Sequence, residues 1–188
     1  MSSGSIAASA ALLAGVLLAG CGGSGTTSSG PASTAFEELF LQGEALDSRL
    51  ALLEATETMP TTGTARYRGV AAFGDTRDEA AISSAPLALS AVTLTADFAD
   101  SRVSGSLEDF RTGGGGVSGR MTLRDGSIVD NGFHAGLDGA VDLGGGLTLE
   151  GQAMSGLFLG AGAAAVAGIL EGTDGSGGEV FGVFGAER

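Results

Sequence analysis

The side chains that could do chemistry are few in this chain. It contains one cysteine, Cys21, and one histidine, His134, among 188 residues. A metal centre or a nucleophile–base pair needs several such groups close together. Carboxylates are numerous, but none stands in a context that predicts a raised pKa. We therefore predict that the protein is not an enzyme, and we expect no cofactor and no metal site.

Two short features could still suggest a ligand site. His134 lies between Phe133 and Ala135, and if these two face a core, strand alternation directs His134 to solvent; the alternative is a haem or metal ligand. Residues 174–178, DGSGG, suggest a calcium loop but lack its alternating acids and its twelfth-position Glu. We expect a hairpin loop there.

Cys21 is the residue with the clearest predicted chemistry. Residues 7–20 are apolar and small, and they are too short to span a bilayer, so residues 1–20 are predicted to be a signal peptide. Leu18-Ala19-Gly20-Cys21 resembles the lipobox of bacterial lipoproteins, which implies that the Cys21 thiol carries a lipid. The alternative is a free thiol, since a lone cysteine cannot form an internal disulfide. Gly22 after the cysteine implies retention in the outer membrane.

The charge of the chain restricts its partners. The net charge is −13, there is no Lys, and all nine basic residues are Arg. Nucleic acid is excluded as a partner because its phosphates require many cationic contacts. A basic partner, or simply a soluble acidic surface, fits better. Arg66 with Arg68, and Arg120 with Arg124, are spaced to share strand faces, either as solvated barrel exterior or as a patch for an anion or a partner protein.

The elements that position these residues begin with a tether and a helix. Residues 21–33 are rich in Gly, Ser and Thr and are typical of a flexible tether. Thr34 and Glu37 form a predicted capping box that starts a helix, and residues 34–62 are predicted to be an amphipathic helix and linker ending at Met59-Pro60. This helix could pack on a barrel, or it could bind a partner.

From Gly63 the hydrophobic period changes from 3.6 to 2, which indicates strands. In residues 91–98, AVTLTADF, apolar side chains alternate with Thr and Asp. Antiparallel strands in order with short turns favour an all-β, eight-stranded, up-and-down β-barrel over residues 63–188, because closure removes exposed sheet edges; a β-sandwich is the alternative. The predicted strands are 64–73, 91–98, 102–110, 117–124, 133–143, 147–158, 163–171 and 179–186.

The segment Gly156–Leu170, GLFLGAGAAAVAGIL, has no charge and could be mistaken for other structures. It is too short for a membrane helix and contains four glycines. Residues 160–165 match the G-x-G-x-x-A dinucleotide pattern, but no βαβ unit surrounds them. We predict strand, turn and strand. Gly168 is expected to leave room for Phe158 or Phe184, so that Gly168→Val would overpack the barrel.

A family resemblance is carried by three groups of residues. Gly156–Gly160 with Ala163, Val166 and Gly168, followed by residues 182–188, GVFGAER, resemble the C-terminal barrel signature of the transferrin-binding protein B family of surface lipoproteins. Residues 63–69, 96–98 and 103–105 resemble its opening strands. Ala161, Ala165 and Leu170 depart from the pattern, and the handle domain and second lobe of the full-length receptors have no counterpart.

The resemblance implies a lipid-anchored protein on the bacterial outer membrane, facing outward, whose barrel docks a protein partner in iron or haem acquisition. Two alternatives remain open at this point. One is a small-ligand carrier, although the predicted interior is crowded with Gly, Ala, Val, Leu and Phe and has few polar groups. The other is a structural envelope lipoprotein.

Overall fold

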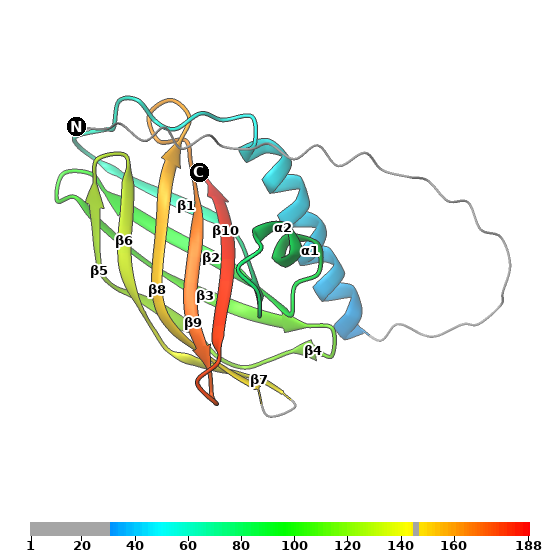
Figure 1. Cartoon of the computed structure of the whole chain (residues 1–188). Coiled ribbons are helices and arrows are strands. Elements are labelled where there is room, and N and C mark those ends of the chain that lie inside the picture. Colours follow the sequence, from blue (N-terminus) through cyan, green and yellow to red (C-terminus); the bar gives the residue numbers. More distant parts are fainter. Residues whose placement is uncertain (1–30, 145–146) are drawn as a thin grey trace, which may run out of the picture.

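The computed structural model describes residues 31–144 and 147–188, and its central feature is a closed barrel (Figure 1). Each barrel strand pairs antiparallel with the next along the chain, and β1 pairs with β10 to close the ring. The predicted eight-stranded up-and-down barrel is confirmed. Its strands are β1 (Thr64–Gly74), β2 (Ala88–Asp97), β3 (Arg102–Thr112), β5 (Met121–Val129), β6 (Gly132–Asp138), β8 (Leu147–Leu159), β9 (Ala165–Asp174) and β10 (Glu179–Glu187).

Two short strands extend the sheet at the rim of the barrel. β4 (Gly115–Gly116) pairs with β3, and β7 (Ala140–Gly144) pairs with β8. The strand predicted at 133–143 is therefore divided into β6 and β7. The division occurs at Gly139, whose φ of 135° lies in a region that side chains rarely adopt. The strand predicted at 117–124 begins later, at Met121, and continues to Val129.

Aromatic side chains fill the interior of the barrel. The Phe158 ring lies 5.9 Å from the rings of Tyr67 and Phe98 and 6.1 Å from that of Phe133, measured between centroids. The Tyr67 hydroxyl donates a hydrogen bond to the Ala163 carbonyl at 2.8 Å, as a buried phenol requires. Burial raises the pKa of Tyr67 above its ordinary value. The inside of the barrel is thus packed protein core.

The first helix, α1 (Pro31–Leu50), differs from its prediction at both ends. It begins before Thr34, so it includes the last residues of the predicted tether, and the predicted start at Thr34 is wrong. It ends at Leu50, well before Met59, because the backbone that follows forms hydrogen bonds with the barrel instead of continuing the helix. The Thr56 N–H donates to the Phe158 carbonyl at 2.9 Å, and the Gly160 N–H donates to the Glu54 carbonyl at 2.8 Å. This segment therefore lies against the β8–β9 end of the barrel.

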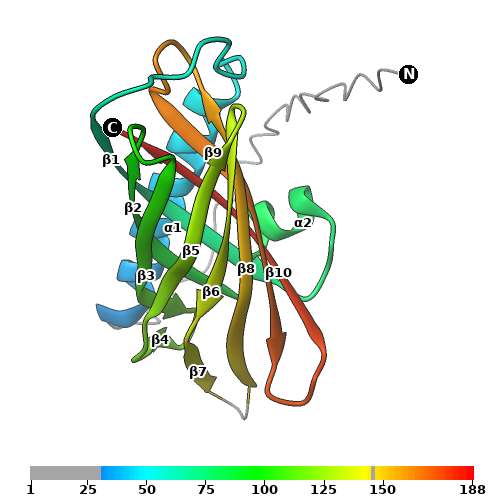
Figure 2. The same ribbon diagram turned by 90° about the vertical axis from the view of Figure 1, so that its left-hand side faces the viewer.

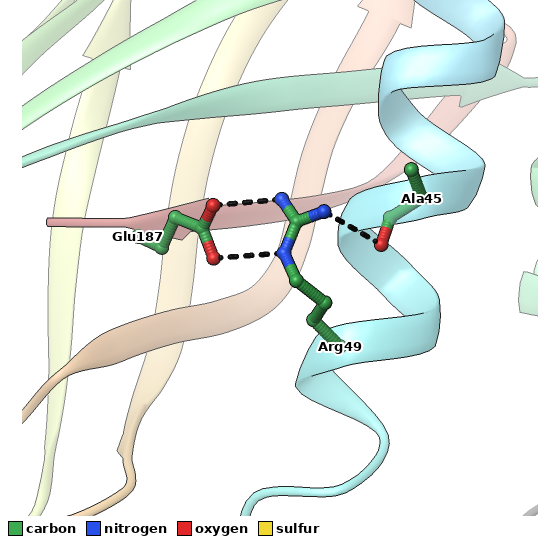
Figure 3. Close-up of polar contacts among 3 residues, drawn as sticks. All are labelled: Ala45, Arg49 and Glu187. Carbon is green, nitrogen blue, oxygen red and sulfur yellow. Dashed lines mark hydrogen bonds and ion pairs between the residues drawn. The ribbon is translucent and has the colours of Figure 1, made fainter.

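Helix α1 packs on the outside of the barrel wall. Leu46 and Leu50 are buried against Ala165, and β10 passes beneath them at Gly185, where a Cβ would meet Leu50. Next to this contact, Arg49 donates two hydrogen bonds of 2.7 and 3.2 Å to the Glu187 carboxylate of β10 (Figure 3). Arg49 also donates a hydrogen bond of 3.1 Å to the Ala45 carbonyl. The hydrogen bond to Glu187 raises the pKa of Arg49. The helix therefore lies over the outer face of β10 and β1, reaches β2, β3 and β4, and touches β9 at Ala165.

A second helix, α2 (Glu79–Ser84), was not predicted from the sequence. Asp78 caps it, accepting hydrogen bonds from the N–H groups of Ala80 and Ala81. Its buried Ile82 lies against Gly74 of β1. Figure 2 shows both helices outside the barrel, and both contact β10. Among the described residues, no helix is both long and apolar enough to cross a membrane.

Candidate functional site

The predicted lipid site cannot be placed in the fold. The predicted signal peptide, Cys21 and the tether up to residue 30 lie outside the described residues. They stay predictions. The other residues singled out from the sequence lie within residues 31–144 and 147–188.

His134 is exposed on β6, and its neighbours Phe133 and Ala135 point into the core, as the strand alternation predicts. In the register of the sheet it lies between Ser127 on β5 and Ser155 on β8. Across residues 31–144 and 147–188, no cluster of three or more His, Cys, Asp or Glu residues could hold a metal ion. His134 is therefore a solvent-facing side chain on the barrel wall.

The loop of residues 174–178 is the β9–β10 hairpin, as predicted. Asp174 Oδ1 accepts hydrogen bonds from the Ser176 hydroxyl at 2.7 Å, the Gly178 N–H at 2.6 Å and the Ser176 N–H at 2.9 Å. These bonds, the one from the Ser176 hydroxyl most of all, hold the pKa of Asp174 below its ordinary value. The carboxylate stabilises its own turn.

The four arginines with strand spacing do not form one patch. Arg120 precedes β5 and pairs with Glu108 at 3.1 Å, and Arg124 on β5 pairs with Asp138 at 3.3 Å. Arg66 and Arg68 are exposed on β1 and make no ion pair within the described part of the chain. Because the two β5-side arginines are already matched by carboxylates, they do not form a cationic site for an anion.

The barrel interior offers no obvious ligand site either. Tyr67, Phe110 and Phe158 are fully buried in it, and large aliphatic side chains occupy the space around them. An eight-stranded barrel is just wide enough for its own side chains or for one small ligand. Here side chains occupy it, which disfavours the small-ligand carrier.

The outer wall, in contrast, carries a shallow groove over β6, β8 and β9, with a volume of about 410 Å³. Three apolar side chains on it are unusually open to solvent: Val129 at 53%, Leu157 at 52% and Ile169 at 43%. His134 and Ser155 supply its polar groups, and the rest of the lining is Gly132, Phe133, Gly156, Ala167 and Gly168. We call this surface the outer groove. A cluster of exposed apolar side chains is typical of a surface that contacts another molecule.

Sequence reasoning missed the outer groove, although a signal for it was present. In the segment Gly156–Leu170 both strand faces are apolar: Phe158 and Leu170 face the core, while Leu157 and Ile169 face outward. A strand with one solvated face normally alternates with polar residues. The absence of that alternation here marks an outer face that is not simply solvated.

Comparison with known proteins places the barrel in a known family. A family model described as the C-lobe and N-lobe beta barrels of Tf-binding protein B matches residues 59–188. The solved structure of an intact TbpB with N and C lobes is 26% identical over 71% of this chain and 28% of that chain, with a TM-score of 0.46. A mutant of the vaccine antigen transferrin-binding protein B from Haemophilus parasuis is 25% identical over 71% of this chain and 29% of that chain, with a TM-score of 0.45.

The isotype 1 transferrin-binding protein B from serogroup B Neisseria meningitidis is 20% identical over 69% of this chain and 26% of that chain, with a TM-score of 0.42. The chain thus spans less than a third of the length of these three structures. No curated protein matched it in sequence.

Proposed function

We propose a function from the family to which this chain belongs, that of the C-lobe and N-lobe β-barrels of Tf-binding protein B. Members of this family are binding proteins, not enzymes. The protein we propose is a lipoprotein of the bacterial outer membrane, facing outward, whose barrel docks a protein partner and serves iron or haem acquisition. The chemistry of such docking is non-covalent contact with the barrel wall.

The observation that carries this proposal is the outer groove on a barrel whose interior is filled. Core side chains occupy the space where a barrel could hold a small ligand, so binding falls to the outer surface. On that surface Val129, Leu157 and Ile169 expose apolar area beside the polar groups of His134 and Ser155. Apolar anchors with a few polar groups are the usual composition of the centre of a protein interface.

The partner can be tested with a protein of the kind named by the relatives, which are transferrin-binding proteins. Immobilised full-length chain would be exposed to iron-loaded transferrin, to iron-free transferrin and to extracts from the bacterium's surroundings, with heat-denatured chain as the control. We expect saturable retention of one protein by the folded chain alone. Equal retention by both forms of the chain, or no retention, would contradict the docking function.

The anchor rests on Cys21 and needs its own experiment. Cells fed a labelled fatty acid should incorporate the label into the wild-type chain and not into Cys21→Ser. Protease added to intact cells should digest the wild-type barrel, because the proposed orientation faces outward. A labelled Cys21→Ser chain, or a barrel protected until the cells are broken, would refute the anchor or the orientation respectively.

A further inference from the structure

The outer groove continues a strip of wall that α1 already covers. Ala167 of β9 lines the groove and also packs against the contact that Leu46 and Leu50 make with Ala165. In the register of the sheet, Leu157 lies opposite Ala167, and Ser155 lies opposite Ile169. An apolar strip thus runs along the outside of β8 and β9, and the helix buries only one end of it. The uncovered end is the outer groove.

The charges around the uncovered end are acidic. Asp130 follows Val129 in the β5–β6 turn, and Glu171 lies two residues beyond Ile169 on the same outward face of β9. Both are exposed, and neither makes an ion pair with any residue of 31–144 or 147–188.

Two cations near the groove are already paired with carboxylates. Arg124, which lies over Gly136 of β6, pairs with Asp138 at 3.3 Å. Arg77 lies over the ring of Phe181, which is the residue opposite Glu171 in the sheet. Arg77 also forms an ion pair with Glu179 at 3.1 Å. Arg102 of β3 is exposed and makes no ion pair within the described residues, and it lies opposite Ser127 of β5, which in turn lies opposite His134. Asp130 and Glu171 together outweigh this one cation, so the rim is acidic on balance, in a chain whose net charge is −13.

Building on the proposed docking function, we propose that the outer groove binds a protein segment in which an apolar side chain is flanked by Lys or Arg. The apolar side chain contacts Leu157 and Ile169, and its cationic neighbours approach Asp130 and Glu171. Ser155 and His134, side by side between these contacts, provide hydrogen-bonding groups for the segment. Complementary charge of this kind speeds association and selects the partner.

Two other occupants fit the charges less well. A second copy of the chain would bring its own Asp130 and Glu171 to the same contact, since a two-fold interface uses one patch on both subunits. An anionic lipid surface would meet the same repulsion. A basic protein segment is the occupant that turns these charges into attraction.

The test uses the full-length chain and a displayed library of random peptides as the probe. Selection at low salt should enrich peptides that place Lys or Arg beside a large apolar residue. Affinities of the enriched peptides would then be measured for the wild type and for Ile169→Glu, with thermal melting to show that the variant is folded. We expect Ile169→Glu to weaken binding by about tenfold or more, as loss of a central apolar contact does.

Two further variants separate charge from apolar contact. Asp130→Asn combined with Glu171→Gln should weaken binding by about threefold or more at low salt and remove most of its salt dependence, because screened rim charges act through association. Leu41→Glu alters an apolar side chain on α1 that is 61% exposed and outside the groove. It should change the affinity by less than about twofold.

Several results would overturn this inference. They are an absence of enriched peptides, enriched peptides without basic residues, binding unaffected by Ile169→Glu, a wild-type dimer that Ile169→Glu dissociates, and flotation with anionic vesicles that Ile169→Glu abolishes. A protein partner retained equally by the wild type and Ile169→Glu would leave the docking function standing and refute only the groove. Peptide binding as expected, with no protein retained from any source, would support the groove as a peptide site and contradict the docking function.

Discussion

Gly156 and Gly168 lie opposite each other on β8 and β9, and each has a different reason for lacking a side chain. A Cβ on Gly156 would lie 2.8 Å from both Phe133 Cε1 and Phe184 Cζ. A Cβ on Gly168 would instead meet backbone, namely the Ser155 carbonyl oxygen and the Gly156 Cα. The expectation that a phenylalanine ring fills the space at Gly168 is therefore wrong. The glycine that makes room for rings is Gly156.

Gly168→Val should destabilise the barrel by about 1–3 kcal/mol, because an added side chain forces backbone shifts in a packed core. Strand backbone cannot move aside as a flexible side chain can. Urea unfolding at equal m-value measures the difference. Gly113→Val is the matched control, since the space around Gly113 is open. A Gly168→Val midpoint at or above that of the wild type would contradict the close approach of β8 and β9.

Ser176→Ala should raise the pKa of Asp174 toward its ordinary value, because the Ser176 hydroxyl is the main cause of its depression. A carboxylate with a depressed folded-state pKa stabilises the fold above its unfolded pKa of about 4, and this contribution is lost as pH falls through the folded pKa. Wild type and Ser176→Ala should therefore converge in stability in acid. Carboxyl NMR titration checks the shift, and an unchanged midpoint for Asp174 in the variant would refute it.

At the scale of elements, α1 is held by apolar contact and by one exposed ion pair. Leu50→Ala should release α1 without unfolding the barrel, because Leu50 is the side chain pressed on β10 at Gly185. Hydrogen exchange should then accelerate across α1 and stay slow in β1 and β10, as expected for a separate cooperative unit. Leu41→Ala, at a mostly exposed position of the same helix, should leave exchange unchanged. Equal acceleration in helix and barrel would show that they unfold together.

Arg49→Gln should have a much smaller effect on α1 than Leu50→Ala. Both Arg49 and Glu187 are largely exposed, and exposed ion pairs contribute little because water and salt screen them. The melting midpoint and the exchange rates of α1 should stay close to those of the wild type at physiological salt. A release of α1 as complete as that of Leu50→Ala would mean that the ion pair, and not the apolar contact, holds the helix.

The elements differ in how well the sequence predicted them, and the reasons are physical. The strands were found because alternation reports which side chains face the core, a local property. The end of α1 and the position of the segment after it depend on two long-range hydrogen bonds, which no local pattern reports. The Thr56 N–H donates to the Phe158 carbonyl, and the Gly160 N–H donates to the Glu54 carbonyl. Helix α2 is too short for a periodic signal, although its cap, Asp78, could have marked it.

The candidate site was less predictable than the fold. Exposure of Leu157 and Ile169 depends on where α1 ends, because the helix covers the neighbouring strip of the same wall. The acidic rim is likewise set by which arginines find partners, and these partners lie on other strands. From the sequence alone, the acidic chain fitted either a basic partner or simply a soluble acidic surface, and the groove was not identified as a binding place on the barrel.

For the whole molecule, Phe158 is the residue on which the core depends most. It contacts three aromatic rings, those of Tyr67 on β1, Phe133 on β6 and Phe98 just after β2. Phe158→Ala should therefore cost about 3–5 kcal/mol and lower the unfolding midpoint of every strand together. Leu157→Ala, the next residue on the same strand, faces solvent and should change stability by only about 0.5 kcal/mol. Similar losses from the two variants, measured by urea unfolding, would contradict the assignment of inner and outer faces.

The pairing of β1 with β10 determines when the barrel can close during folding. Arg68, near the start of β1, lies opposite Glu187, near the end of β10, and β10 is also the strand that completes β9. Until residues 179–187 pair, β1 and β9 each present an unpaired edge, which other chains can join. Pairing between such distant segments is slow to form. A chain in which residues 179–187 have not yet paired would thus remain an open sheet prone to aggregation. Pairing of β10 both closes the barrel and forms the surface on which Leu50 of α1 packs.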